Sequence, residues 1–468
     1  MAKQDKYQID MTHGPLFGKV ILFSVPLILS GVLQYLFHAA DLIVIGQFAP
    51  PGAMASVGAV AFHIQVLLAL FIGTSVGVNV LAANYIGAKE KTKCSQVVHT
   101  AVAFSAYAGI GSMLLMLFLT PYALRITNTP AEILEQSELY MRISCFGIPF
   151  TLLYNFGSAV MRADGDTRRP LYYLIISGIV NVTLNLIFVA GCGMEVAGVA
   201  IATVIAQILA AVFVLNYLFR ARTAFRLKMA RLRINWQVLK GILWIGLPAG
   251  FQSSMFSLSN LILQSSINTF GELAVAGNTA ALYLESIVYV CSYAYYQSII
   301  SFIGQNMGAK KYARVFRSIL YCTICSVAIV TPLGLLSWIY GEQLLAIFNT
   351  NPEVIGWGMI RLKVLMVTYV LCALMDIVEG GLRGLGRPIM PAVATLVFVC
   401  AMRVAWVFWV FPFKPTMEWL LFCYPVTWTL TTLTCGVYMY YICKRLFGLQ
   451  FKQHTYAIFP FNPLRSIH

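Results

Sequence analysis

The chain has 468 residues, of which 59% are hydrophobic and only 10% charged, and its formal net charge is +15. One water-soluble core cannot bury so much apolar surface, so the composition predicts a polytopic membrane protein. Basic loops at an anionic membrane surface account for the positive charge, which leaves nucleic-acid binding unsupported.

Twelve apolar runs follow one another along the chain, each long enough to cross about 30 Å of hydrocarbon as a helix. Lys and Arg concentrate in the loops after every second run, whereas the other loops hold only Arg125 and Lys414. Cytoplasmic loops are the basic ones, so this alternation predicts twelve spans in the cell membrane with both termini cytoplasmic. The runs lie near residues 17–45, 54–86, 94–120, 133–161, 169–191, 195–219, 236–268, 272–303, 315–340, 354–381, 389–411 and 417–443.

The second half of the chain repeats the first. Pro26 in the first run is matched by Pro248, and Gly87-Ala88-Lys89 after the second run is matched by Gly308-Ala309-Lys310. A duplicated membrane bundle is typical of transporters that rock one half against the other. The sequence therefore predicts an all-α integral membrane fold, with two pseudo-symmetric six-helix bundles around a central cleft.

The basic loop in the middle of the chain divides it into two lobes. The short polar N-terminus lacks the cleavage pattern of a signal peptide, so the first helix is expected to be retained. The predicted organisation is a cytoplasmic N-terminal segment at 1–16, an N-lobe at 17–219, a basic cytoplasmic linker at 220–240, a C-lobe at 236–445, and a cytoplasmic or interfacial tail at 446–468.

Several kinds of chemistry have no motif in this sequence. It contains no GxxxxGK[ST] loop for nucleotide phosphates and no HExxH or GxSxG signature, and its six histidines are scattered. Its eleven cysteines show no pairing pattern and fit the role of small hydrophobic residues. We therefore expect neither an enzyme nor a resident cofactor or metal.

Ionisable side chains within the predicted helices of the first half are candidates for ion coupling, because hydrocarbon makes each one costly. Asp41 lies in the outer half of the first helix, with His38 one turn earlier on the same face and Gln34 a further turn back. His63 lies at similar depth on the second helix. A carboxylate there can be neutralised by a proton or a cation. The alternative is a polar network that only fixes packing.

The second half carries charges where the first half has neutral polar groups. Glu285 corresponds to His63, Asp376 to Asn155, and Arg403 to Asn185. These positions are polar at the same depth in both halves, which lipid-facing positions would not be, so we expect the side chains to face the bundle interiors. Arg403 cannot lose its proton and needs a carboxylate, for which Glu285 is the first choice and Asp376 the second. Two further residues are expected at wet helix ends, Arg361 as a snorkelling side chain and Glu379 as a solvated one.

The seventh helix carries a polar stripe at Gln252, Asn260 and Gln264, which is expected to line water or substrate. Aromatic and methionine side chains nearby would give a cavity adaptable walls for flat cationic guests. The alternative is ordinary packing, because aromatic residues are common in membrane cores. The candidates are Met255, Phe256, Tyr283 and Tyr289.

These residues resemble the multidrug and toxic compound extrusion (MATE) transporters over about residues 15 to 445. The resemblance is carried by the Pro26…Asp41…Gly46 pattern, the two Gly-Ala-Lys helix ends, the loop at 161–167 and Leu382-Arg383-Gly384. It implies antiport, in which Na⁺ or H⁺ entry drives the export of cationic, amphiphilic drugs through an alternately open cleft.

The resemblance also identifies individual residues of the N-lobe. Asp41 matches the aspartate proposed to take the coupling ion in the family, and Asn181 matches its asparagine on the fifth helix. Asn185 stands where many members have a second acid. Losing that acid leaves one carboxylate and favours H⁺ over Na⁺ as the coupling ion.

Two other functions compete with this one. A lipid-linked sugar flippase of the same wider superfamily would need a large basic cleft, and Arg403 is the one deep basic residue that we expect. A channel would need a continuous polar pore, which isolated acids do not provide. We expect a monomer embedded in membrane lipid, with a cationic or amphiphilic small molecule and H⁺ or Na⁺ as its ligands.

Overall fold

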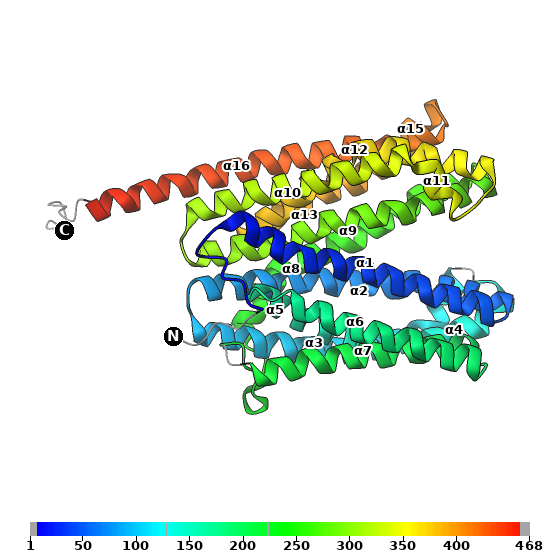
Figure 1. Ribbon diagram of the computed structural model, residues 1–468, viewed down its shortest axis with the longest axis horizontal. Coiled ribbons are helices and arrows are strands. Elements are labelled where there is room, and N and C mark those ends of the chain that lie inside the picture. The colour runs from blue at the N-terminus through cyan, green and yellow to red at the C-terminus, as the bar shows by residue number, and fades with distance from the viewer. Residues whose placement is uncertain (1–6, 128, 222–223, 459–468) are drawn as a thin grey trace.

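The computed structural model describes residues 7–127, 129–221 and 224–458, and within these ranges every regular element is a helix (Figure 1). Pro residues in the long helices lie inside continuous helical segments, as at Pro26 of α1 and Pro248 of α8. The elements are α1 (Leu16–Phe48), α2 (Pro51–Gly87), α3 (Lys91–Ile126), α4 (Ala131–Cys145), α5 (Ile148–Ala163), α6 (Arg168–Asn185), η1 (Leu186–Gly191), α7 (Glu195–Arg220), η2 (Met229–Arg231), α8 (Trp236–Asn268), α9 (Glu272–Gly308), α10 (Tyr312–Ile339), α11 (Gly341–Ala346), α12 (Pro352–Gly384), α13 (Ile389–Ala394), η3 (Thr395–Ala401), α14 (Met402–Ala405), η4 (Trp406–Val410), η5 (Phe411–Phe413), α15 (Met417–Leu421) and α16 (Cys423–Ile458).

The predicted all-α membrane fold is confirmed. Among the described residues, nine helices are long and apolar enough to cross a membrane, and the number is ten if α4 and α5, which are bent by 43°, count as one span. The remaining two predicted spans are the 33-residue helices α8 and α12. Both have the necessary length, but α12 carries Arg361, Asp376, Glu379 and Arg383, which lower its apolarity.

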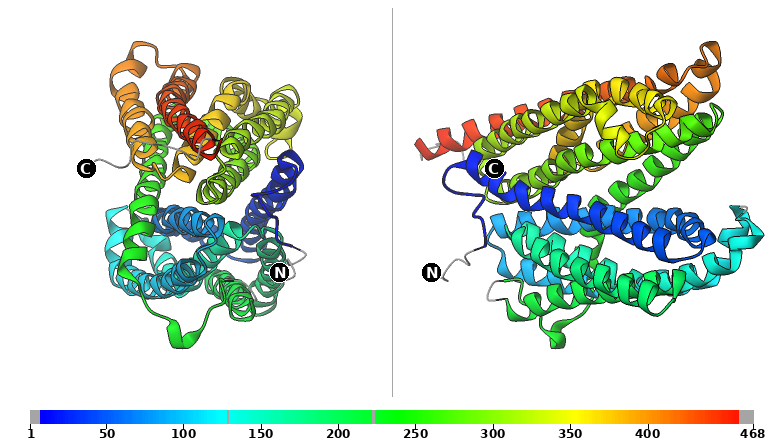
Figure 2. Two further views of the ribbon diagram at one scale, coloured as in Figure 1. Left: turned by 90° about the vertical axis from the view of Figure 1, so that its left-hand side faces the viewer. Right: turned by 45° about the vertical axis from the view of Figure 1, so that its right-hand side comes forward.

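The helices gather into two groups that lie one above the other (Figure 1 and Figure 2). We call α1–α7 the N-lobe and α8–α16 the C-lobe. The two groups meet where α2 packs along α8 and α9. The first helix lies between them: Val20 and Phe23 pack in a cluster with α9 and α10, whereas Val44 and Ile45 pack with residues of η1 and α7.

The sequence repeat is visible in the backbone at the ends of α2 and α9. Lys89 and Lys310 both adopt a left-handed conformation, with φ of 60° and 54°. The preceding glycines allow the two helices to touch across the lobes. A Cβ atom on Gly87 would lie 1.9 Å from the carbonyl oxygen of Gln305, and one on Gly308 would lie 1.8 Å from that of Asn84. Only glycine permits backbones to approach this closely.

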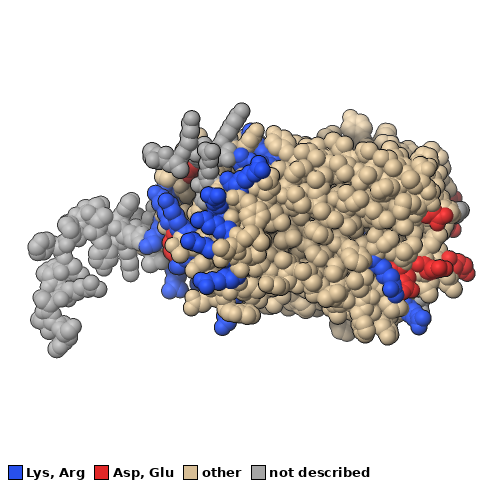
Figure 3. Space-filling model, turned by 90° about the horizontal axis from the view of Figure 1, so that it is seen from below, with Lys and Arg blue, Asp and Glu red and all other residues tan. Residues whose placement is uncertain are grey.

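Charge separates along the long axis of the molecule. Most Lys and Arg side chains in view gather at one end, which we call the basic end, and most Asp and Glu side chains lie at the other (Figure 3). The first described residues and the last turns of α16 also lie at the basic end (Figure 1). The last helix continues to Ile458, well past the predicted end at 443, and the final part of the predicted tail, 459–468, lies outside the described residues.

Candidate functional site

The N-lobe brings Asp41 of α1 to the end of α6. The side-chain amide of Asn185 donates a hydrogen bond to Asp41 Oδ1 and makes a longer contact of 3.5 Å with Asn181 Oδ1. Asn181 in turn donates to Thr203 Oγ1 of α7 at 3.3 Å. Both asparagines are buried, with exposed fractions of 0% and 5%. Three predicted residues therefore form one chain of polar contacts, in which Asp41 is the charged member.

The other predicted N-lobe residues lie on α1 and α2. His38 and Gln34 precede Asp41 on α1, and both side chains are exposed. His63 is partly buried on α2, and its Nδ1 donates to the carbonyl oxygen of Ala59 at 3.1 Å. Asn185, rather than a histidine, is the residue that hydrogen-bonds Asp41.

The predicted pairing of Glu285 with Arg403 is wrong. Arg361 of α12 binds Glu285 of α9 instead, with Nε at 2.9 Å and Nη2 at 2.7 Å from the same carboxylate oxygen. Its Nη1 donates to Asn278 at 2.9 Å, and the side chain is only 3% exposed. The snorkelling expectation for Arg361 failed because α9 supplies an acid at its depth, which the position of Arg361 near a helix end did not reveal.

Arg403 lies in an aromatic and amide environment without a carboxylate partner among the described residues. It is fully buried, and its guanidinium lies 4.0 Å from the ring centre of Tyr424 and 5.3 Å from that of Phe256. Nη1 donates to Asn260 at 3.2 Å and Nε to Thr427 at 3.3 Å. The cation is thus stabilised by ring faces and neutral oxygens.

Asp376 is the isolated carboxylate of the C-lobe. It is buried on α12 and accepts a hydrogen bond of 2.6 Å from Ser292 of α9. Within the described part of the chain, neither Asp376 nor Asp41 forms an ion pair with Lys, Arg or His. Asp41 in the N-lobe and Asp376 in the C-lobe are therefore both held by a neutral hydrogen-bond donor.

A second charged network in the C-lobe corrects the expectation for Glu379. Its carboxylate is buried and accepts from Thr395 at 2.5 Å and from Gln252 at 2.8 Å. Arg383, one turn later on α12, lies 3.6 Å from it and also donates to Gln252 and Tyr296. The spacing of four residues between Glu379 and Arg383 was the available sequence signal, because such pairs are neighbours on a helix.

The residues predicted to line a substrate cleft do not form one surface. Gln252 belongs to the Glu379 network, and Asn260 accepts hydrogen bonds from Arg403 and Tyr424. Gln264 joins Asn278 and Asn268, so the stripe on α8 connects helices within the C-lobe instead of facing open water. These three side chains do not line a cleft because the second half of the chain offers each of them a polar partner at its own depth.

The aromatic and methionine candidates also lie in separate environments and do not line one cleft. Phe256 packs against Arg403, and the exposed Tyr283 stacks on Phe348 at 5.9 Å. Met255 lines an apolar groove beside η3 and η4. Tyr289 stacks with Tyr293 at 6.0 Å, and that ring stacks on Tyr296 at 5.3 Å, which forms a row of rings along α9 near Asp376.

The described residues include no group of three or more His, Cys, Asp or Glu side chains arranged to hold a metal ion. The buried acids occur singly or with an arginine, each contacted by side-chain donors. A single carboxylate with donor neighbours can exchange a proton, whereas cations such as Ca²⁺ and Mg²⁺ require several oxygen ligands.

Comparisons with known proteins agree with this architecture. The MatE family model matches residues 26–187 and 248–407. The chain is 25% identical to the probable multidrug resistance protein YpnP of Bacillus subtilis, over 84% of this chain and 88% of the relative. It is also 25% identical to the probable multidrug resistance protein NorM of Thermotoga maritima, over 82% and 84%.

Among solved structures, a multidrug resistance MATE family transporter in an outward-facing conformation superimposes with a TM-score of 0.87 at 21% identity, over 95% of this chain and 99% of that one. This likeness concerns the fold. Together with the family match, which covers both halves of the repeat, it shows that the chain belongs to the MatE family of multidrug and toxic compound extrusion transporters.

Proposed function

We propose that the protein is a secondary active antiporter that exports cationic, amphiphilic compounds in exchange for H⁺. The observation that carries the proposal is Asp41, an intramembrane carboxylate whose recorded side-chain partner is the neutral amide of Asn185. A group in hydrocarbon without a compensating cation gains most from taking up a proton or a cationic ligand. Competition between the two for one carboxylate is the simplest form of exchange.

The environment of Asp41 supports H⁺ over Na⁺. Asn185 presents its N–H₂ to the carboxylate, and that donor would repel a metal cation. His38 lies one turn away on the exposed face of α1, where it can relay a proton between water and Asp41. The other hydrogen-bond partners of Asn185 and Asn181 are neutral side chains, so Asp41 is the one negative charge of this N-lobe site.

We assign a supporting role to Asp376 in the C-lobe. It lies beside the row of tyrosines that includes Tyr289, and stacked rings with a nearby carboxylate suit a flat organic cation. Glu285 and Glu379 are already paired with arginines, which leaves Asp376 as the buried C-lobe carboxylate without an arginine partner among the described residues.

The two lobes are in closer contact at the basic end than at the other end, and this difference supports alternating access. The backbone contacts of α2 with α8 and α9 extend from Gly73 to the basic ends of these helices, where Gly87 and Gly308 meet the opposite lobe. The exposed Gln34 and His38 lie toward the other end of α1. We place the basic end in the cytoplasm of a cell-membrane protein, because basic loops remain on that side.

The flippase alternative is less well supported than drug export. Two relatives are named as probable multidrug resistance proteins. The deep arginines do not form a basic cleft, because Arg361 and Arg383 are paired with acids and Arg403 is fully buried beneath aromatic rings.

The proposal is tested by dye transport in everted membrane vesicles, with the pH gradient and the Na⁺ gradient imposed separately. A pH gradient alone should drive transport of a cationic dye such as ethidium, and a protonophore should abolish it. Vesicles containing Asp41→Asn serve as the matched negative control. Transport that persists with a protonophore and requires an imposed Na⁺ gradient would overturn H⁺ coupling, and no transport of any cationic dye under either gradient would overturn the cargo class.

A further inference from the structure

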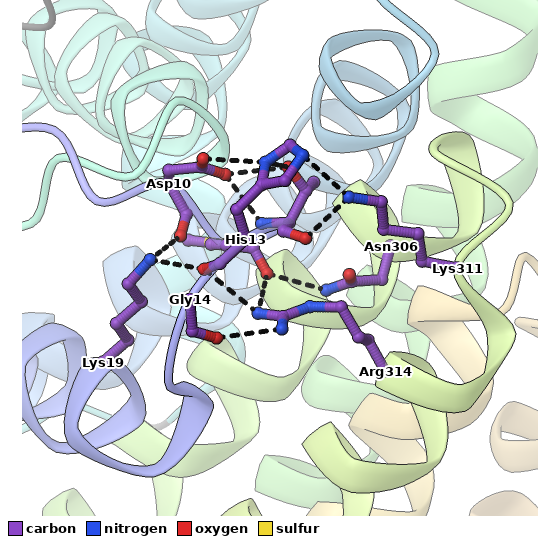
Figure 4. Close-up of polar contacts among 9 residues, drawn as sticks. Asp10, His13, Gly14, Lys19, Asn306, Lys311 and Arg314 are labelled. Carbon is purple, nitrogen blue, oxygen red and sulfur yellow. Dashed lines mark hydrogen bonds and ion pairs between the residues drawn. The ribbon is translucent and has the colours of Figure 1, made fainter.

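The segment before the first helix joins both lobes at the basic end. Residues 7–15, which we call the latch segment, pass from the loop after α5 to the start of α10 before α1 begins (Figure 4). We propose that this segment is a latch that holds the basic end of the two lobes closed, and that it must release from one lobe before this end can open.

The N-lobe side of the latch is a backbone contact. The amide of Ile9 donates to the carbonyl oxygen of Gly165 at 3.2 Å, and the Gln8 side chain donates to Asp164. Gly165 has φ of +88°, and a Cβ atom there would lie 2.4 Å from the carbonyl oxygen of Ile9. Position 165 therefore requires glycine for two reasons. A side chain would strain the left-handed backbone, and its Cβ atom would collide with the latch segment.

The C-lobe side consists of cationic and amide donors that point at backbone carbonyl groups. Arg314 donates to Gly14 at 2.9 Å and to Met11 at 3.0 Å, and Lys311 donates to Thr12 at 2.9 Å. Asn306 at the end of α9 adds a bond of 3.2 Å to the carbonyl oxygen of Met11. The side chains thus satisfy the carbonyl groups of an irregular segment that has no helix or sheet partner.

The segment is also anchored by burial and by its own polar contacts. The Met11 side chain is fully buried in a cluster that includes Phe302 of α9 and Val315 of α10. Asp10 accepts from the backbone amide and the hydroxyl of Thr12, both at 2.8 Å, which closes a local turn. The segment is therefore folded onto both lobes and is not a free N-terminal extension.

This placement couples the latch to the movement of the lobes. The basic ends of α2 and α9 are in backbone contact directly beside it, and Gln305 donates across the lobes to the carbonyl oxygen of Ala163 at 2.7 Å. If the lobes separate at this end, Gly165 and Arg314 move apart, and a segment attached to both cannot keep both sets of bonds. The latch segment must therefore release one of the lobes either before the basic end opens or at the same moment.

The test measures opening directly and does not depend on the cargo or the coupling ion. Ser301 is buried on α9 and donates to Asn79 of α2 at 3.0 Å, so Ser301→Cys places a thiol in the closed interface beside the latch. Its reaction with a membrane-impermeant maleimide, applied to each face in turn and read by mass spectrometry of the modified peptide, reports how often the basic end opens. Cys192, the exposed native cysteine of the described residues, is replaced by serine in all variants.

Removing the C-lobe donors with Lys311→Gln and Arg314→Gln together should raise the labelling rate about fivefold or more, as expected for a coupling of ordinary size. Gly165→Val should do the same from the N-lobe side. The control is Arg317→Gln, which removes one positive charge from an exposed side chain three residues after Arg314 on α10. All variants should melt within a few degrees of the parent.

Equal labelling rates in the parent and in both latch variants would overturn the proposal. A rise in the Arg317→Gln control of the same size would also overturn it, because loss of basic charge alone would then explain the effect. If a latch variant does not fold, a bifunctional maleimide provides the second measurement by tying the segment to both lobes, through Gln8→Cys with Asp164→Cys on the N-lobe side and Gly14→Cys with Arg314→Cys on the C-lobe side. Cross-linked protein should label more slowly at position 301 than uncross-linked protein, and an unchanged rate would count against the latch.

Discussion

Glu285 and Arg361 form a buried ion pair between α9 and α12, with Arg361 Nη2 2.7 Å from Glu285 Oε2. The exposed fractions of the two side chains are 12% and 3%. Asn278 accepts a further bond from the guanidinium, and the Tyr424 ring lies 5.5 Å from it. The pair therefore connects two long helices of the C-lobe at a depth where solvent screens little of the charge.

A double-mutant cycle should detect this pair. Glu285→Gln or Arg361→Gln alone leaves one charge uncompensated and should reduce the free energy of unfolding by about 3–5 kcal/mol, whereas the double variant should lose less than the sum. The same cycle for Glu285 with Arg403 should be additive, because Arg403 contacts Asn260 and Thr427 instead. Additivity in the first cycle would contradict the observed contact.

The wrong choice of partner for Glu285 illustrates what the sequence could provide. Hydropathy and the internal repeat were sufficient to predict the helices and the position of each charged residue along its helix. Depth does not specify which face of a helix meets which neighbour. Arg361 lies on α12, which packs along α9, whereas Arg403 lies on α14, which packs against α8 and α16. Asp41 with Asn185 was easier to identify, because the family resemblance placed both residues in one N-lobe site and their contact requires only α1 beside α6.

The ring of Tyr424 should be essential for stabilising Arg403, since the guanidinium lies 4.0 Å from its centre. Tyr424→Leu removes the ring face and should destabilise the protein by about 1–2 kcal/mol beyond Tyr424→Phe, which keeps the face and loses the hydroxyl with its contact to Asn260. Thermal melts in detergent compare the two variants. Equal losses would mean that the hydroxyl, not the ring, supports Arg403.

Asp41→Asn should abolish coupled efflux while expression and melting temperature remain near those of the parent. The substitution preserves shape and removes the charge that we assign to ion exchange. Dye efflux in cells with matched protein levels provides the measurement, and Glu138→Gln, at an exposed acid that pairs with Arg142 on its own helix, is the control. Full drug resistance with Asp41→Asn would exclude Asp41 from coupling.

The close approach at Gly87 should make even one methyl group costly. Gly87→Ala places a carbon 1.9 Å from the carbonyl oxygen of Gln305, so the lobes must separate slightly, at about 1–3 kcal/mol. Gly111→Ala is the matched control, because a Cβ atom on Gly111 meets nothing within 4 Å. This control should be neutral or stabilising by about 0.5–1 kcal/mol. Thermal melts of both variants decide the matter, and equal stability would contradict the contact.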